Sequence, residues 1–244
     1  MIHCYDKLWP KHPFRFRVPY QSLAPTQNSD KVEYRKTPSD IKGTVLSLLD
    51  DLDDDEMIYW CIDDKYPIYL NVPHIEKLHS RLYNPADSQQ TMSGLLFCRC
   101  RGMLRSENLS GLSITDGESV LLERVGYEQI WIHQYLKVKV IRYLFESFPD
   151  QIRAAKEMDD YKKKLVKPSS HELFVTKENM AVFGESTSRG VLTKNCYFSM
   201  KEAEINLPDW CSEISDQEII MGSMADQNKP LKRGYRWLKE KLRT

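Results

Sequence analysis

Two adjacent aspartates, Asp63 and Asp64, directly follow an apolar run and are the residues of this sequence best placed to do chemistry. The run, residues 57–62, is rich in residues that favour strands, so it predicts a strand buried on both faces. In open α/β sheets, ligands bind beyond the carboxyl ends of strands, and carboxylates there suit a divalent cation that also binds water and phosphate oxygens. The alternative interpretation is an acidic turn, because aspartate is common in turns.

A denser acidic cluster lies just upstream, at residues 50–56, between a helix-like stretch and the predicted strand. No hydrophobic frame surrounds these carboxylates, and clustered like charges repel each other unless solvent or a cation screens them. We therefore expect residues 50–56 to form a solvated loop. The position of a carboxylate in the sequence pattern matters more here than the number of carboxylates.

Hydrophobic periodicity predicts the elements that must position Asp63 and Asp64. Strand-like segments lie at residues 14–18, 57–62, 68–70, 95–100, 119–122, 173–175 and 180–183. Helix-like segments lie at residues 41–49, 72–83, 127–148 and 150–165, and the third of these is the longest and most amphipathic. Strands that alternate with helices are typical of an α/β fold. We expect one domain over residues 1–244.

Composition excludes several classes of protein. Lysine plus arginine equals aspartate plus glutamate at 35 each, so no global positive field attracts nucleic acid, and we predict no nucleic-acid partner. The six cysteines lack the spacing of a zinc site and are expected to be reduced. Because no apolar run approaches the length of a membrane span and no signal-peptide pattern opens the sequence, we expect a cytoplasmic protein.

The order of these segments resembles the bacterial and viral nucleotide-sugar glycosyltransferases of the GT-A fold. The resemblance rests on the segment 9–14 (WPKHPF), the capped helix at 41–49, the strand leading to Asp63-Asp64, and the segment 129–131 (QIW). It implies a Rossmann-like mixed sheet in which a middle strand ends in an acidic element that binds Mn²⁺ or Mg²⁺. The sequence departs from the family at its start, where the first strand is shortened or missing, and in having D-D-K instead of D-x-D.

The resemblance implies roles for further residues. Lys65, beside the aspartates, and Arg189, in the glycine-flanked loop 184–190, would bind the donor diphosphate, and Trp131 would stack on a sugar. Glu185 in the same loop is the first candidate for the base that takes the acceptor proton, and Asp64 would assist catalysis beside the metal. Rival bases are Glu128, Glu157 and Asp159.

Each of these candidates has a plainer interpretation. Lys65 and Glu185 can be solvated loop residues, and Trp131 can be a core aromatic. His133 lies near Trp131 in the predicted long helix, and a lone histidine there is more often packed or hydrogen-bonded than a metal ligand. Because successive side chains of a strand point to opposite faces, we expect one of Asp63 and Asp64 to bind the metal and the other to orient it.

Three functions remain open at this stage. The first is a metal-dependent glycosyltransferase with a nucleotide-sugar donor and a glycan or lipid-linked acceptor. The second is a metal-dependent phosphohydrolase or nuclease, which would want more converging acidic ligands. The third is a glycosyltransferase-like binding subunit that lost nucleotide recognition together with its first strand.

A basic helix is predicted for residues 229–244, where lysines and arginines alternate with aromatic and aliphatic residues. Such a helix can lie on an anionic membrane, and lipid-linked acceptors would be found there. The plainer alternative is a terminal helix that packs its apolar side onto the domain and leaves its lysines in water.

Overall fold

The computed structural model describes residues 1–26, 29–83, 92–98, 106–185, 187–188, 191–192, 197 and 200–205. The chain divides into two compact units, Met1–Phe183 and Gly184–Thr244. In the second unit, β11 (Thr187–Ser188) pairs antiparallel with β12 (Val191–Leu192), and Met200 and Ile205 are buried. The predicted basic helix at 229–244 lies outside the described residues.

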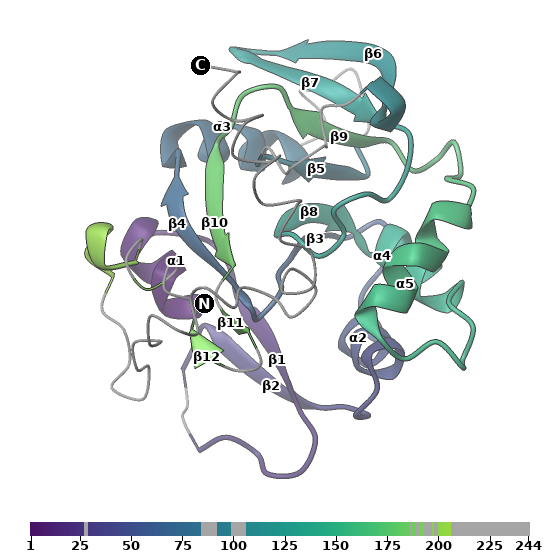
Figure 1. Cartoon of the computed structure of the whole chain (residues 1–244). Coiled ribbons are helices and arrows are strands. Elements are labelled where there is room, and N and C mark those ends of the chain that lie inside the picture. Colours follow the sequence, from purple (N-terminus) through teal and green to yellow (C-terminus); the bar gives the residue numbers. More distant parts are fainter. Residues whose placement is uncertain are drawn as a thin grey trace, which may run out of the picture. The chain divides into compact units, whose positions relative to one another are not determined.

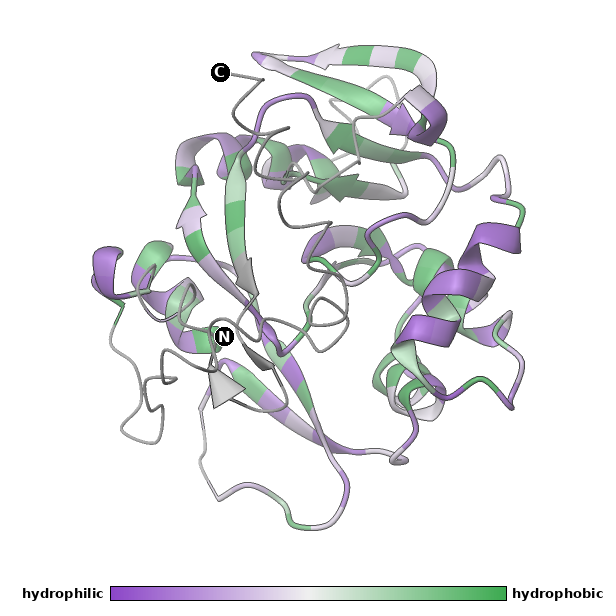
Figure 2. Ribbon diagram, viewed as in Figure 1, coloured by the Kyte–Doolittle hydropathy of each residue, from purple (hydrophilic) through white to green (hydrophobic). Residues whose placement is uncertain are grey.

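The first unit contains a six-stranded mixed sheet, as the α/β prediction requires (Figure 1). Its strand order is β3-β8-β5-β9-β7-β6, and β5–β9 is its parallel pair. The strands are β3 (Met57–Trp60), β5 (Gly94–Leu96), β6 (Leu109–Asp116), β7 (Ser119–Arg124), β8 (Gln134–Lys137) and β9 (Leu173–Thr176). Figure 2 shows that β5 and β9 are predominantly hydrophobic, as strands inside a covered sheet should be.

Two further pairs of strands complete the described sheets of the first unit. The strands β1 (Phe16–Tyr20) and β2 (Val32–Lys36) pair in parallel, with Phe16 opposite Val32. β4 (Lys65–Leu70) pairs with β10 (Ala181–Glu185), and the boundary between the two units falls within β10.

Helices cover the strands and enclose two apolar cores. They are α1 (Ile2–Leu8), α2 (Ile41–Leu49), α3 (Val72–Tyr83), α4 (Val138–Glu146) and α5 (Ala155–Tyr161), with short 3₁₀ turns at Ser106–Asn108 and Lys162–Lys164. One core contains Tyr5, Phe16, Leu95, Tyr135 and Phe174, and we call it the first core. The second core is built by α2 and α4 and contains residues such as Val45, Leu49, Ile141, Leu144 and Phe145.

The predicted helix at 127–148 is wrong over its first half. Gln129 has a φ of 61°, which interrupts any right-handed helix, and residues 134–137 form β8 between β3 and β5. Tyr135 lies opposite Tyr59 of β3, so pairing with two strands outweighs the local helical spacing. The helix α4 begins only at Val138 and ends at Glu146, and α5 likewise begins later than predicted.

The strand predicted for residues 57–62 is shorter and less buried than expected. β3 ends at Trp60, and of its four residues Met57 is buried while the others are half-buried. It is also the terminal strand of the six-stranded sheet, not a middle strand. β3 is less buried than expected because it pairs with one described strand, β8, and its residues also line a cavity.

The acidic stretch at residues 50–56 is an exposed loop, as predicted, and basic residues neutralise it. Asp51 forms ion pairs with Arg17 and Arg35 at 2.7 and 2.6 Å. Asp54 contacts Arg142 at 2.8 Å, and Asp55 contacts Lys139 at 2.7 Å. These ion pairs connect the loop that follows α2 to α4.

In the part of the chain that the structure describes, no helix has both the length and the apolar character needed to cross a bilayer.

The N-cap of α2 allows a direct test of the capping prediction. The Asp40 carboxylate accepts a hydrogen bond from the Gly43 amide at 2.7 Å, and loss of such a cap costs about 1 kcal/mol. We expect Asp40→Ala to lower the free energy of unfolding by about that amount in urea denaturation. Asp40→Asn should retain most of the stability, and equal losses in the two variants would show that the cap does not stabilise α2.

Candidate functional site

Asp63 and Asp64 are the two central residues of a tight turn that joins β3 to β4. The Lys65 amide donates to the Ile62 carbonyl at 3.2 Å, which closes a four-residue turn over residues 62–65. We call these four residues the acidic turn. The strand-end geometry expected from the sequence is therefore replaced by a turn, in which Asp63 is exposed and Asp64 is half-buried.

A buried histidine holds the start of this turn. His133 Nε2 lies 2.8 Å from the Ile62 carbonyl, and its Nδ1 lies 2.6 Å from the Tyr5 hydroxyl. A carbonyl oxygen only accepts hydrogen bonds, so Nε2 must carry the proton and Nδ1 must accept from Tyr5. The Tyr5 hydroxyl has one proton, so in its 3.0 Å contact with the Tyr59 hydroxyl the donor must then be Tyr59. The Ile62 carbonyl thus accepts from both Lys65 and His133, and the backbone that presents the two aspartates is fixed from two directions.

The electrostatics of His133 favour this arrangement. Burial lowers the pKa of His133 to about 4, and the positive charge of Lys65 acts in the same direction. The imidazole is therefore neutral near pH 7, which is the state in which Nδ1 can accept from Tyr5. Burial also raises the pKa of Tyr5 well above its usual range, so its hydroxyl keeps the proton that it donates.

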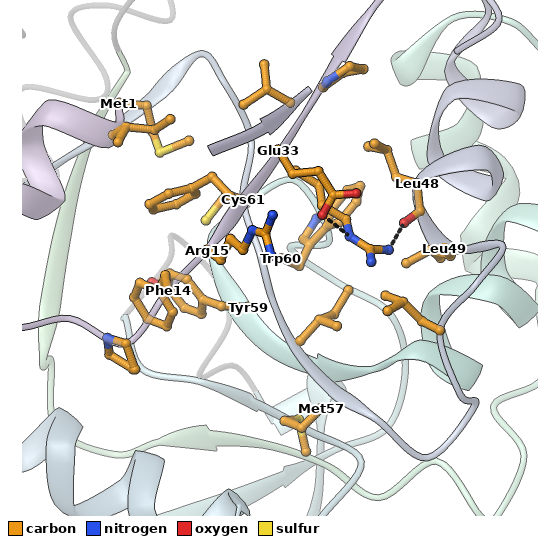
Figure 3. A pocket seen from close by; sticks show the side chains of 18 of the residues that line it. Met1, Phe14, Arg15, Glu33, Leu48, Leu49, Met57, Tyr59, Trp60 and Cys61 are labelled. Carbon is orange, nitrogen blue, oxygen red and sulfur yellow. Dashed lines mark hydrogen bonds and ion pairs between the residues drawn. The ribbon is translucent and has the colours of Figure 1, made fainter. Parts of the chain in front are cut away.

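A cavity of about 1010 Å³ lies along β3 and reaches the acidic turn through Asp63. Figure 3 shows it between aromatic side chains of β3 and the helical residues Leu48 and Leu49. Phe14 and Tyr59, which both line it, stack with ring centroids 4.4 Å apart. The volume is at the upper end of the range for small-molecule sites.

Two arginines, Arg15 just before β1 and Arg17 within it, also line the cavity, and they differ in exposure and in hydrogen-bond partners. Arg17 is engaged by the Leu48 carbonyl at 2.9 Å, by Asp51 at 2.7 Å and by Glu33 at 3.6 Å. Arg15 is exposed, and Figure 3 shows its guanidinium among the lining side chains. Arg15 is therefore the arginine better able to turn towards an anion, because Arg17 would first have to give up its partners.

Other reactive groups of the cavity are held in their unreactive forms. Burial raises the pKa of the Cys61 thiol far above its usual range, so it is not a thiolate near pH 7. Burial likewise raises the pKa of Tyr59 well above 10. Neither residue suits a nucleophile or a base, and the carboxylates that line the cavity are those of Asp63, Glu33 and Glu56.

The donor set of the acidic turn fits a cation that keeps part of its hydration shell. Within the described residues, no group of three or more histidine, cysteine, aspartate or glutamate side chains converges as a metal site would require. Asp63 and Asp64 thus provide two carboxylates, and water or substrate oxygens would have to complete the coordination, which is how Mg²⁺ is commonly bound.

The other predicted site residues are distributed over both units. Lys65 is half-buried and is the first residue of β4, directly after the aspartates. Trp131 is half-buried in the second core, where its ring lies edge-on to Phe145 at 6.1 Å, and it is not among the residues that line the cavity. Glu185 is the last residue of β10, but its side chain and the whole of Arg189 lie outside the described residues.

Two of the rival bases have structural partners. Glu157 Oε2 accepts from the Ala154 amide at 3.3 Å at the start of α5, and Asp159 forms an ion pair with Lys162. Glu128 is half-buried, and its backbone carbonyl accepts from Arg124. None of these three residues lines the cavity that Asp63 reaches.

The sequence pattern alone did not indicate Tyr5, Arg15 or the anchoring role of His133. Arg15 belongs to an alternating apolar and basic segment, and that alternation was a usable signal for a strand but not for a site. Tyr5 and His133 are 128 positions apart in the chain, so no local spacing could have joined them.

Comparison of the chain with protein-family models, with curated proteins and with solved structures gave no match.

Proposed function

We propose that this protein is a metal-dependent glycosyltransferase that moves a sugar from a nucleotide-sugar donor to a glycan or lipid-linked acceptor. The observation that carries the proposal is the acidic turn after β3, whose exposed Asp63 reaches a large cavity. In open α/β sheets, ligands bind beyond the carboxyl ends of strands. β3 ends at Trp60, and the acidic turn begins two residues later, at Ile62.

In this proposal the acidic turn holds Mn²⁺ or Mg²⁺ through Asp63 and Asp64. When bound, the cation supplies positive charge beside the diphosphate that leaves the sugar. Asp63 is accessible from the cavity, whereas the half-buried Asp64 either shares the cation or orients Asp63. Arg15 on the same cavity and Lys65 next to the turn add positive charge for the phosphates.

The fixed backbone of the turn is an advantage for such chemistry. Groups that stabilise developing charge act best when they are held in place before the reaction, because no reorganisation then accompanies it. Tyr5 and His133 fix the Ile62 carbonyl without touching solvent, as their exposures of 0% show. They are positioning residues in this proposal, since they act through the backbone of the turn.

Proton removal from the acceptor is assigned to Glu185, with Arg189 as a further phosphate or sugar contact. Both remain proposals from the sequence pattern and the family resemblance. A base must lie within hydrogen-bond reach of the acceptor proton, directly or through one water. An acceptor linked to lipid would bring the basic segment 229–244 near an anionic surface.

One observation favours a second candidate function, a binding subunit without catalysis. β3 is the terminal strand of its sheet, so no further described strand lies beside its other edge, and a missing first strand would leave nucleotide recognition incomplete. The phosphohydrolase hypothesis has less support, because the described residues bring no third acidic or histidine ligand to Asp63 and Asp64.

Nucleotide binding distinguishes these functions. We expect one or more nucleoside diphosphates to raise the melting temperature of the protein in the presence of Mn²⁺, and to have little effect when EDTA replaces the metal. At a ligand concentration of 100 times Kd, the stabilisation is about 2.7 kcal/mol. Hydrolysis or transfer of a sugar from the matching nucleotide sugar would then separate an enzyme from a binding subunit. The absence of metal-dependent binding for every nucleoside diphosphate would exclude both glycosyltransferase-like functions.

A further inference from the structure

A chain of three hydrogen bonds joins the wall of the cavity to the acidic turn. Tyr59 lines the cavity, and its hydroxyl lies 3.0 Å from the Tyr5 hydroxyl. The Tyr5 hydroxyl lies 2.6 Å from Nδ1 of His133, whose Nε2 lies 2.8 Å from the Ile62 carbonyl. The chain therefore begins at a side chain of the cavity wall and ends at the backbone that presents Asp63.

The acceptor at the end of this chain fixes the direction of every bond in it. Because the Ile62 carbonyl can only accept, His133 donates through Nε2 and accepts at Nδ1 from Tyr5. The single proton of the Tyr5 hydroxyl is then used, so Tyr59 donates to Tyr5. No bond of the chain can be reversed unless the others change with it, and mutual polarisation strengthens hydrogen bonds that follow one another in this way.

Ring packing holds the same side chains together. The Tyr5 ring stacks on His133 with centroids 5.9 Å apart and meets the Tyr59 ring edge-on at 5.7 Å. Tyr59 stacks in turn on Phe14, another lining residue, and Figure 3 shows these two rings side by side. Because the three hydrogen-bonded side chains come from α1, β3 and the segment before β8, they connect elements that are distant in the sequence.

We propose that Tyr59 is a positioning residue for the acidic turn, so that the aromatic wall of the cavity and the turn form one preorganised unit. This inference rests on the proposed function, in which the turn holds the metal. The hydroxyl proton of Tyr59 is directed at Tyr5, so a ligand in the cavity meets the ring of Tyr59 and not a donor. The turn is ordered before the ligand arrives, and groups fixed in advance need no reorganisation during a reaction.

The Lys65 amide reports on the turn, because it donates to the same Ile62 carbonyl as His133. Its hydrogen exchange, followed by NMR on the full chain without metal or nucleotide, measures local opening of the turn. Tyr59→Phe keeps the ring and removes the hydroxyl, and we expect it to accelerate this exchange about 5-fold. Tyr5→Phe removes the bond made directly to His133, and we expect about 10-fold.

Tyr127→Phe is the matched control for these variants. The Tyr127 hydroxyl lies 2.8 Å from Nδ1 of the buried His171, so it makes the same type of contact outside the chain of bonds. This variant should lower the free energy of unfolding in urea, as the other two do, and leave the exchange of the Lys65 amide unchanged. Within each protein, the Ile152 amide donates to the Pro149 carbonyl in a separate turn at 2.9 Å, and its exchange should not change.

The nitrogen resonances of His133 test the direction of the bonds without any variant. We expect a proton on Nε2 and none on Nδ1 in the unchanged protein, and a proton on Nδ1 would overturn the proposal. Unchanged exchange of the Lys65 amide in Tyr59→Phe, or equal acceleration in Tyr127→Phe, would also overturn it, since the turn would then not depend on this hydroxyl. If Tyr5→Phe does not fold, Tyr59→Phe still removes a bond of the chain and decides.

Titration with Mn²⁺ separates this inference from the proposed function. If both hold, Tyr59→Phe should weaken Mn²⁺ binding about 10-fold in calorimetry, at the lower end of the effect of losing a residue that supports a metal ligand. Full Mn²⁺ affinity in Tyr59→Phe would show that Tyr59 does not position the turn for the metal. Absence of Mn²⁺ binding by the unchanged protein would contradict the proposed function, while the exchange of the Lys65 amide would still decide whether Tyr59 orders the turn.

Discussion

Replacement of either aspartate of the acidic turn by asparagine is expected to abolish Mn²⁺-dependent nucleotide binding. Asparagine keeps the size of the side chain and the ability to occupy the turn, but it removes the negative charge that a hard cation requires. Loss of a residue that only supports a metal ligand costs 10- to 100-fold in affinity, so loss of a direct ligand should cost at least about 100-fold. We expect Asp63→Asn to have the larger effect, because Asp63 is exposed and reaches the cavity.

Isothermal titration calorimetry with Mn²⁺ and the best nucleoside diphosphate measures this effect. The control is Asp150→Asn, which removes a carboxylate that is 94% exposed and pairs with Lys42, away from the cavity. Circular dichroism would establish that each variant is folded. If both Asp63→Asn and Asp64→Asn keep the affinity of the unchanged protein, the acidic turn is not a metal site and the glycosyltransferase proposal loses its basis.

The elements nearest to the acidic turn were largely predictable from the sequence. The helices at 41–49 and 72–83 have the predicted bounds, because a 3.6-residue apolar period marks both and a capping residue marks the start of the first. The apolar run before Asp63 does form a strand, although it ends at Trp60. Local signals sufficed for these elements because each is short and its local preference agrees with its packing.

The segment around β8 shows where local signals fail. Ile130, Trp131, Tyr135 and Val138 have helical spacing, yet they serve two different elements and a turn. Tyr135 pairs with Tyr59 of β3 and with Leu95 of β5, and both partners are about 40 or more positions away in the sequence. Strand pairing of this kind depends on tertiary partners, which periodicity within a window does not contain.

The candidate site also combines a local signal with contacts between distant elements. The aspartates were identified from sequence because an apolar run leads to them, but their anchoring by Tyr5 and His133 depends on contacts between distant elements. The cavity combines residues of α1, β1, α2 and β3, which are distant in the sequence, so no local pattern could have indicated it. The shortened or missing first strand stays a prediction from the family resemblance.

The buried His133, which donates to the Ile62 carbonyl, predicts a pH-dependence of stability that can be measured without any ligand. The pKa of His133 is lowered to about 4 by burial, while an exposed histidine has a pKa near 6.5. Between these values the unfolded chain binds a proton that the folded chain does not. Stability from this group is therefore fully present above pH 6.5 and declines as the pH falls towards 4.

We expect this histidine to lower the free energy of unfolding by about 2 kcal/mol between pH 7 and pH 5, since each pH unit in the window costs about 1.4 kcal/mol. His133→Gln removes the titration and retains an amide donor for the Ile62 carbonyl. Urea denaturation at pH 7 and pH 5 should thus show a smaller decrease for the variant. The buried or half-buried His79 and His171, whose pKa values burial also lowers, contribute in the same direction in both proteins, so the difference between the proteins isolates His133.

His79→Gln is the matched control for this comparison, because His79 is less completely buried and contacts the Tyr135 hydroxyl, not the acidic turn. It should reduce the pH-dependence less than His133→Gln does. Protonation of His133 would give Nδ1 a proton that points at the Tyr5 hydroxyl, so Tyr5 would have to withdraw its own proton from that contact. Parallel pH profiles for the unchanged protein and His133→Gln would mean that His133 takes up its proton as readily in the folded protein as in the unfolded chain, so burial would not hold the imidazole neutral at pH 5.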